Sequence, residues 1–265
     1  RQMCIRDRVG DAAQTIYSFA GATPEYLTEF TQTYPEAKVV ELIRDYRSTP
    51  QIVNLANQVL SQAKGADGKP LGGTVRLVSQ REAGPAVSWF AAPDDETEAK
   101  EIARRIQDLL TEGLKPSQIA VLFRTNAQAA LFGVALGAKR IPFVIKDQVT
   151  KLAGETADSG TQTEDDEPGG VTLASLHSAK GLEWEAVFLA GASEGLLPIS
   201  LAKTAAAIEE ERRLCYVGVT RARSRLIVSF AKARRDGAAQ EREACRFLAP
   251  FWPRRSEMLR RSGRH

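Results

Sequence analysis

A short apolar run that turns into a polar loop constrains this chain more than any other feature. Residues 171–183 read VTLASLHSAKGLE, so β-branched and apolar residues come first, and Ser, His, Lys and Gly follow before an acid. An apolar run of this length bounded by polar and turn residues is typical of a buried strand. The segment therefore predicts a buried strand that runs into a polar loop. Elsewhere in the chain, Arg124, Thr125 and Asn126 follow another buried strand, where open α/β sheets hold their active loops.

The rest of the chain alternates between apolar runs of strand length and amphipathic helices. We expect strands at 38–42, 75–78, 86–90, 119–123, 142–145, 171–175, 186–190 and 226–230, and helices at 24–34, 50–63, 97–110, 126–137 and 205–217. The acidic turn at residues 94–96 favours one of these helix starts. Strands that alternate with helices of this length predict an α/β fold, with helices on both faces of a parallel sheet.

Composition sets only broad limits on what the chain can do. With 265 residues, 43% of them hydrophobic, the chain can bury one large or two small cores. The net charge is +3, so nucleic-acid binding would have to come from local basic groups. Three widely spaced cysteines, Cys4, Cys215 and Cys245, indicate a reducing cytosol rather than disulfides or a metal site. No apolar run approaches the ~18 residues of a membrane span, and no secretory signal is evident.

Two stretches fall outside the predicted fold. Residues 1–8, RQMCIRDR, carry four charges where a buried strand should precede the loop at Val9, so we interpret them as a non-native leader. Residues 151–170 are rich in glycine and contain the acidic run 164–167, which predicts a flexible acidic linker. The linker divides the fold into a first part, 9–150, and a second part, 171–250. A basic tail follows at 251–265.

Four segments, taken in order, carry the functional signal. They are residues 9–22 (VGDAAQTIYSFAGA), 45–48 (DYRS), 171–183 (VTLASLHSAKGLE) and 210–222 (EERRLCYVGVTRA). In this order they resemble motifs III, IV, V and VI of superfamily 1 DNA helicases of the UvrD/Rep/PcrA type, from Val9 to about Ala231. The segments 10–23 and 197–200 look closest to a UvrD paralogue branch. The resemblance implies the second RecA-like motor domain, called 2A, in which the linker replaces the usual accessory subdomain 2B.

The resemblance also implies an ATP site shared between two RecA-like lobes. The residues it assigns to this site are Gln14, Arg47 and Arg221 in catalysis, and Tyr46, Glu183 and Gly181 in nucleotide binding. Arg47 and Arg221 would be arginine fingers that stabilise charge on the γ-phosphate, and Gln14 would sense that phosphate or its attacking water. Tyr46 would lie against the adenine and Glu183 would accept from the ribose.

What the sequence lacks bears on the same site. No G-x-x-x-x-G-K-[ST] phosphate loop is present, so ATP and Mg²⁺ would be held mainly by a missing N-terminal RecA-like domain. We therefore expect the chain alone to be inactive as an ATP hydrolase. No metal-ligand spacing is found within the chain itself.

A second group of residues is assigned by resemblance to single-stranded DNA. Its members are Tyr17, Phe19, Arg124, Asn126, Ser175 and His177. Tyr17 and Phe19 would stack on bases, which tolerates any sequence. Family members usually carry Trp and then Arg where this chain has Phe19 and Ala20, so the stacking plane is smaller and one basic contact is absent. The charged residues 210–213 are typical of a solvated helix face.

These assignments lead to one expected function and two alternatives. We expect the C-terminal motor domain of an ATP-dependent 3′→5′ DNA helicase that acts on single-stranded and partly duplex DNA in repair. Its expected location is the cytoplasm, at the nucleoid. The alternatives are the motor part of a RecB/AddA-like helicase–nuclease, and a degenerate helicase-like module that only binds DNA. The presence of Gln14, Arg47 and Arg221 argues against degeneration.

Overall fold

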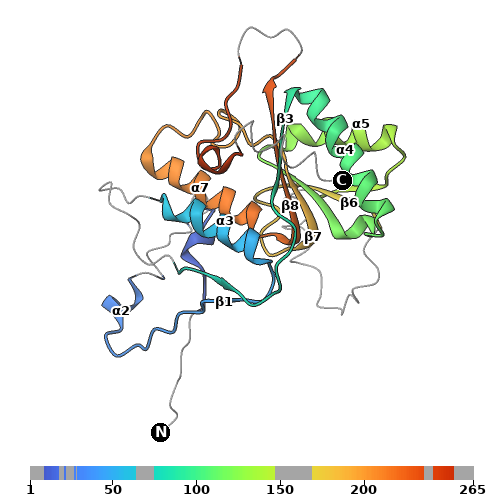
Figure 1. Cartoon of the computed structure of the whole chain (residues 1–265). Coiled ribbons are helices and arrows are strands. Elements are labelled where there is room, and N and C mark those ends of the chain that lie inside the picture. The colour runs from blue at the N-terminus through green and yellow to red at the C-terminus, as the bar shows by residue number, and fades with distance from the viewer. Residues whose placement is uncertain are drawn as a thin grey trace, which may run out of the picture.

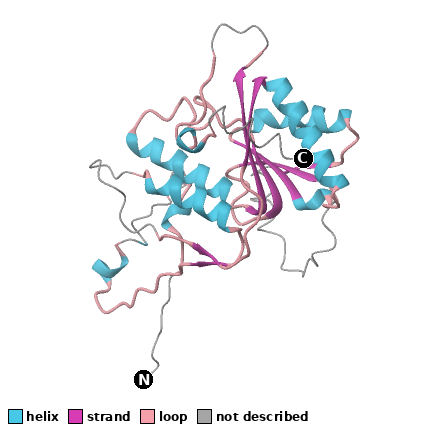
Figure 2. Cartoon of the chain, viewed as in Figure 1, coloured by secondary structure: helices cyan, strands magenta, loops and turns pink. Residues whose placement is uncertain are grey.

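The computed structural model describes residues 9–17, 21, 27, 29–63, 75–146, 169–235 and 241–253. Its centre is a six-stranded sheet with the order β3–β8–β7–β4–β6–β5, in which every neighbouring pair is parallel. Helices lie on both faces of this sheet (Figures 1 and 2). The prediction of an α/β fold built on a parallel sheet is confirmed.

The elements have the following bounds. The sheet contains β3 (Ser88–Asp94), β4 (Ile119–Phe123), β5 (Phe143–Lys146), β6 (Val171–Ser175), β7 (Trp184–Leu189) and β8 (Ala222–Ala233). A separate parallel pair joins β1 (Arg44–Asp45) to β2 (Val78–Ser79). The α-helices are α2 (Phe30–Thr33), α3 (Pro50–Ser61), α4 (Asp95–Thr111), α5 (Ala129–Ala138) and α7 (Ala205–Val219). Short 3-10 helices are η1 (Ala12–Gln14), η3 (Pro116–Gln118), η4 (Asn126–Gln128) and η5 (Ala249–Phe251).

Two apolar cores lie on opposite faces of the sheet. Helices α3 and α7 cover one face, and α4 and α5 cover the other (Figure 1). Strand β4 serves both cores, because Ala120 and Leu122 belong to the first and Ile119, Val121 and Phe123 to the second. Successive side chains of a strand point to opposite faces, so a strand covered on both sides has to be apolar throughout. This explains the unbroken sequence IAVLF.

Side-chain caps fix the helix starts close to the predicted positions. Asp94 accepts a hydrogen bond from the Thr97 backbone N–H at 2.8 Å, and this bond lowers the pKa of Asp94. Thr204 accepts from the Ala207 N–H at 3.1 Å at the start of α7. Each cap satisfies a backbone donor that has no partner within the helix. The acidic turn of α4 was predicted correctly.

Residues 38–42 form no strand, which corrects the prediction. Val39, Val40 and Leu42 are 66%, 67% and 69% exposed, and strand pairing begins only at Arg44 in β1. Strand structure requires a neighbouring strand to exchange backbone hydrogen bonds, and the described part of the chain offers none here. An apolar, β-branched run is therefore left on the surface.

The two parts predicted on either side of the linker belong to one sheet. Strand β5 pairs with β6, with Phe143 opposite Val171 and Lys146 opposite Ala174. Gly170, at the end of the predicted linker, is buried, and a Cβ there would lie 2.9 Å from the Phe143 Cα. Residue 170 thus belongs to the packed body. Residues 151–168 of the predicted linker, with 147–150 before them, lie outside the described residues, as do the leader 1–8 and residues 254–265 of the tail.

Two cysteines that are far apart in sequence meet in the core. Cys215 of α7 and Cys245 are free thiols, both are fully buried, and both belong to the core under α3 and α7. The neighbouring Cys245 thiol, together with burial, raises the pKa of Cys215 well above its usual value. Among the described residues, no group of three or more His, Cys, Asp or Glu could hold a metal ion. Within the same residues, every helix is too short or too polar to cross a bilayer.

Candidate functional site

The predicted site residues divide between the two ends of the parallel strands. Arg124 and His177 follow β4 and β6, so they lie at the carboxyl ends of those strands. Glu183 precedes β7 and Arg221 precedes β8, so they lie at the amino ends. Parallel strands place all their carboxyl ends at one edge of the sheet and all their amino ends at the other. We call these two groups the carboxyl-edge site and the amino-edge site.

The amino-edge site brings the DYRS segment against the loops that precede β7 and β8. Arg47 Nε forms an ion pair with Glu183 Oε2, and Arg47 Nη1 donates to the Thr220 carbonyl at 3.4 Å. Arg223 Nη1 lies 3.6 Å from Glu183 Oε1. Both partners of the Arg47–Glu183 pair are about one-third exposed, at 34% and 36%. Glu183 is therefore shared between two arginines at the surface of the molecule.

Asp45 determines the shape of the DYRS segment. Its Oδ1 accepts from the backbone N–H groups of Arg47 at 2.9 Å and of Ser48 at 2.7 Å. The Ser48 hydroxyl donates to the Ala222 carbonyl at 2.7 Å, which attaches the segment to the start of β8. Side-chain bonds of this kind are how Asp stabilises a turn. Tyr46 is left 69% exposed between them.

Arg221 is deeply buried, with only 1% of its surface exposed. Its Nε donates to the Val217 carbonyl and its Nη1 to the Leu182 carbonyl, both at 3.1 Å. These acceptors are neutral, so neither bond is an ion pair, although the nearby charges of Glu183 and Asp11 act on the guanidinium through space. Burial, with the nearby Arg47 charge, lowers the pKa of Arg221 to about 10, which still leaves it protonated at neutral pH.

Gln14 covers the remaining end of Arg221. Arg221 Nη2 donates to Gln14 Oε1 at 3.4 Å, and Gln14 Nε2 donates to Asp11 Oδ2 at 2.9 Å. Asp11 also caps η1 by accepting from the Ala13 N–H at 2.9 Å. The structure thus brings the predicted catalytic residues Gln14 and Arg221 into contact, and Arg47 lies beside them.

Residues 11–17 run along α7 and join the two edge sites. Tyr216 donates to Asp11 Oδ2 at 3.4 Å, and Arg213 Nε donates to the Thr15 carbonyl at 2.8 Å. At the far end, the Tyr17 hydroxyl donates to the His177 carbonyl at 2.9 Å. One short segment therefore contacts Arg221 at one edge of the sheet and His177 at the other.

The carboxyl-edge site contains the predicted DNA contacts Tyr17 and His177. Their ring centroids are 6.1 Å apart, and the Lys180 Nζ lies 5.1 Å from the centre of the Tyr17 ring. Burial, and then the charge of Arg124, lowers the pKa of His177, so its imidazole is neutral at physiological pH. Lys180 was missed as a site residue, although it stands in the same motif as His177.

Arg124 is not a free surface cation. Its Nε lies 3.0 and 2.9 Å from the two carboxylate oxygens of Glu211, and its Nη2 lies 2.7 Å from Oε1. Glu211 is buried, and Arg212 beside it packs over the Phe247 ring at 4.5 Å. The prediction that residues 210–213 form a solvated face is wrong at these two positions, because α7 packs with them turned inward.

The other predicted residues have mixed surroundings. Ser175 is buried, and its Oγ lies 2.9 Å from Ser178 Oγ, a bond that closes the loop after β6. Asn126 is exposed at the start of η4, and Gly181 is exposed with φ +86°, a backbone conformation that favours glycine. Phe19 lies outside the described residues.

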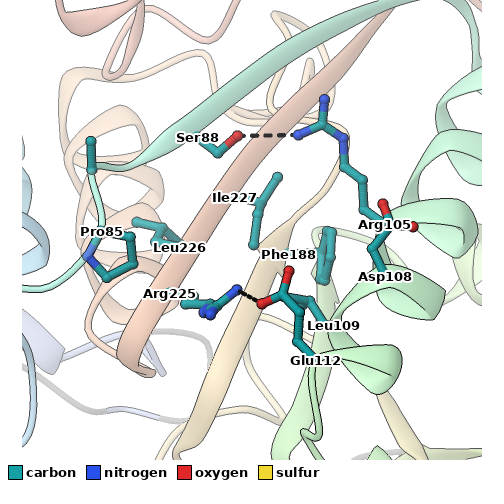
Figure 3. A pocket seen from close by; sticks show the side chains of 11 residues that line it. Pro85, Ser88, Arg105, Asp108, Leu109, Glu112, Phe188, Arg225, Leu226 and Ile227 are labelled. Atoms are coloured by element: carbon teal, nitrogen blue, oxygen red, sulfur yellow. Dashed lines mark hydrogen bonds and ion pairs between the residues drawn. The ribbon is translucent and has the colours of Figure 1, made fainter. Parts of the chain in front are cut away.

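A pocket of about 210 Å³ lies between α4 and the first half of β8 (Figure 3). Its charged groups are already paired, since Arg225 contacts Glu112 at 2.6 Å and Arg105 donates to Ser88 Oγ at 3.1 Å. None of the predicted site residues lines it. The candidate site is therefore defined by the edge sites and not by this pocket.

Comparison with known proteins gives three kinds of match. The model of the UvrD-like helicase C-terminal domain family matches residues 40–155 and 149–233. "ATP-dependent DNA helicase UvrD2" of Mycobacterium tuberculosis is 38% identical over 325 residues, which cover 92% of this chain and 46% of the relative. "ATP-dependent DNA helicase PcrA" of Staphylococcus epidermidis is 32% identical over 145 residues, covering 55% of this chain and 19% of the relative.

A solved structure, the C-terminal domain of a possible DNA helicase from Lactobacillus plantarum, aligns with 72% of this chain and 91% of its own. The TM-score is 0.47 at 20% identity. This chain spans about half the length of the UvrD2 relatives that it matches. Because the family model matches most of the chain, the protein belongs to the UvrD-like helicase C-terminal domain family.

Proposed function

We propose that this chain is the C-terminal motor domain of an ATP-dependent DNA helicase that moves 3′→5′ on single-stranded DNA. In this proposal ATP hydrolysis drives translocation, and translocation unwinds duplex DNA during repair. The observation that carries the proposal is the physical link between the two edge sites. Residues 11–17 carry Gln14, which contacts Arg221 at one edge, and Tyr17, which contacts His177 at the other. Helix α7 carries Glu211, which contacts Arg124 at that second edge.

The amino-edge site is the proposed nucleotide site. Arg47 and Arg221 would stabilise charge on the γ-phosphate, and Gln14 would sense it or orient the attacking water. The fit is supported by the carbonyl groups that hold Arg221 Nε and Nη1 in place of a carboxylate, and by the position of Gln14 over Nη2. A phosphate would displace the Gln14 side chain to reach Arg221. Glu183 would release Arg47 in order to meet a ribose, and the exposed Tyr46 would meet the adenine.

The phosphate cradle and Mg²⁺ would come from an N-terminal RecA-like domain. The surface at residues 39–43 supports this assignment, since Val39, Val40, Leu42 and Ile43 are all exposed. Contiguous exposed apolar residues mark interaction surfaces. UvrD2 of Mycobacterium tuberculosis is about twice as long as the region it shares with this chain.

The carboxyl-edge site is the proposed path of single-stranded DNA. Tyr17 and Phe19 would stack on bases, and Arg124, Asn126 and His177 would contact the DNA strand. Ser175 is buried within its loop, so its contribution would be to shape the loop that presents His177. Lys180 adds a positive charge to this edge, whereas the charge of Arg124 is paired with Glu211.

We further propose that the linker region 151–170 stands in place of the accessory subdomain 2B. The family model matches in two segments that meet at residues 149–155. The match to UvrD2 extends over 325 residues although this chain has 265, so the relative carries additional residues within the matched region. Both facts support an insertion at this point in relatives. A motor without 2B would be a translocase with altered control of unwinding.

Phosphate release tests the proposal that this chain supplies only part of the ATP site. The chain alone, with Mg·ATP and single-stranded DNA, should release phosphate no faster than buffer. When the chain is joined to the phosphate-loop domain of a UvrD-like relative, single-stranded DNA should stimulate its ATP hydrolysis. The joined protein should displace streptavidin from the 5′ end of a biotinylated single strand and not from the 3′ end. Turnover by the isolated chain that disappears in Arg221→Ala would show that the chain holds a complete ATP site, contrary to the proposal.

A further inference from the structure

The contact between Arg124 and Glu211 joins two elements that lie far apart in sequence. Arg124 follows β4, and Glu211 is on the second turn of α7. Three N–H···O contacts of 2.7, 2.9 and 3.0 Å join the Nε and Nη2 groups to the carboxylate. The side chains are 18% and 7% exposed. A bidentate arginine–carboxylate pair of this kind fixes the plane of the guanidinium as well as its position.

The Glu211 carboxylate is also held by a backbone hydrogen bond. Its Oε2 accepts from the Ile199 backbone N–H at 3.1 Å. Both carboxylate oxygens are thus engaged, and the side chain comes from a buried face of α7. A carboxylate fixed in this way holds its partner more rigidly than a surface acid could.

The pairing leaves one edge of the Arg124 guanidinium available. Within the described part of the chain, Nη1 donates no hydrogen bond, whereas Nε and Nη2 both contact Glu211. Arginine has five N–H donors in a planar fork, so it can bind a carboxylate along one edge and an anion along another. The remaining exposure of Arg124 is on the same edge of the sheet as His177.

We propose that Glu211 is a positioning residue for DNA binding, which orients Arg124 so that its Nη1 group meets a backbone phosphate. This inference rests on the proposed function, because it assumes that single-stranded DNA lies over the carboxyl-edge site. Glu211 does not touch the DNA in this arrangement. Through α7, which ends beside Arg221, the same residue also connects the phosphate contact to the amino-edge site.

Salt-dependent DNA binding tests the role. The 265-residue chain and its variants are titrated against a fluorescent oligothymidylate by anisotropy over a series of salt concentrations. Arg124→Ala should weaken binding about tenfold through loss of one charge-assisted contact. It should also reduce the slope of log K against log salt by about 0.7. Glu211→Ala should do the same, and the double variant should be no worse than Arg124→Ala.

Further variants separate positioning from stability and from net charge. Glu211→Gln keeps an acceptor for the Ile199 N–H, and Arg124→Lys keeps the charge but not the fork. Both should fold, and both should still show the reduced slope. Glu210→Gln is the matched control, because it removes a neighbouring charge that does not contact Arg124. A purely structural Glu211 would lower the melting temperature without changing the slope.

Several results would overturn the proposal. Tighter binding by Glu211→Gln would show that Glu211 competes with DNA for Arg124. An effect of Arg124→Ala without any effect of the Glu211 variants would show that Arg124 needs no orientation. An equal change in DNA binding by Glu210→Gln would show that the Glu211 variants act only through net charge. If the wild-type chain binds no oligothymidylate even at low salt, the DNA site of the proposed function fails, and this inference fails with it.

Discussion

The two edge sites hold their central arginines in opposite ways. At the amino edge, Arg221 donates to the Val217 and Leu182 carbonyls, which are neutral. At the carboxyl edge, Arg124 faces the carboxylate of Glu211, which cancels its charge. Carbonyl acceptors position a guanidinium without removing its charge, whereas a carboxylate positions it and neutralises it.

This difference matches the tasks proposed for the two edges. Charge on a transferring phosphoryl group grows in the transition state, so an arginine that is held by carbonyl groups and not by a carboxylate can respond most to that charge. DNA phosphate has the same charge before and after each step, and a motor has to release it repeatedly. An arginine whose plane is fixed by a carboxylate is suited to such a contact, because it meets each phosphate in the same orientation. Substitutions at the amino edge should therefore change rates, and those at the carboxyl edge should change affinity.

The largest effect is expected for Arg221→Ala in a complete helicase that contains this chain. Turnover should fall by roughly 10³–10⁵, as for other arginine fingers, while nucleotide affinity changes little. Arg47→Ala should also lower turnover more than affinity. Arg223→Ala is the matched control, since Arg223 is exposed and shares only Glu183. The measurements are kcat and the Kd for nucleotide. A variant that weakens nucleotide binding and leaves kcat unchanged would contradict the expectation that amino-edge substitutions change rates.

The next effect concerns Glu98, a buried acid on α4 whose hydrogen bonds come from neutral donors. Its Oε1 accepts from the Gly191 N–H at 2.9 Å and from the Ser229 hydroxyl at 2.6 Å. Burial raises the pKa of Glu98 from 4.5 to about 7. The folded state therefore holds this proton more tightly than the unfolded state, and the group's contribution to stability falls as pH rises from about 4.5 to about 7.

Glu98→Gln should remove this pH dependence. The amide keeps an acceptor for both donors, so the variant should have a larger free energy of unfolding than the wild type above pH 7, by about 3 kcal/mol at most. The gain should vanish toward pH 5. Glu101→Gln on the same helix is the opposite control, because Arg104 lowers the pKa of Glu101 to about 2, and its removal should destabilise at neutral pH. Urea unfolding at several pH values measures both.

A smaller effect is expected from the stacking residues of the carboxyl edge. Tyr17→Ala should weaken single-strand binding by about 1–3 kcal/mol, and Tyr17→Phe by less, since it loses only the bond to the His177 carbonyl. Phe19→Trp should tighten binding and Phe19→Ala should weaken it by a similar amount. Anisotropy at fixed salt, in a complete helicase, decides the matter. Equal DNA affinity for all variants would show that these aromatic residues do not stack on bases and serve only in packing.

The sequence predicted the sheet better than the contacts within the site. The strands at 119–123 and 171–175 were predicted to the residue, because a strand buried on both faces is a short unbroken apolar run. The strand predicted at 226–230 is part of the longer β8, whose ends include charged residues. Residues 38–42 have strand composition but no partner, and pairing cannot be read from a single segment.

Motif resemblance named the site residues but not their partners. The pairing of Arg124 with Glu211 spans 87 positions, and that of Arg47 with Glu183 spans 136. No local spacing rule connects residues so far apart, because helix and strand periodicity describe only near neighbours. Whether Glu211 faces water or Arg124 depends on how α7 is packed. The difference between an arginine held by carbonyl groups and one paired with a carboxylate therefore emerged only from the fold.

The smallest effect should come from shortening the connection between β5 and β6. Deleting Thr156–Glu167, which lie outside the described residues, would cut this connection to about half its length. Because the closure entropy of a flexible loop changes slowly with length, stability should rise by only about 0.6 kcal/mol. That corresponds to roughly 1–2 °C in melting temperature for a chain of this size. DNA affinity and the effect of Arg221→Ala should be unchanged, since β5 and β6 already pair directly within one sheet. A fall of several degrees, or cleavage by protease elsewhere before this region, would show that these residues pack on the domain and that the two edge sites depend on them.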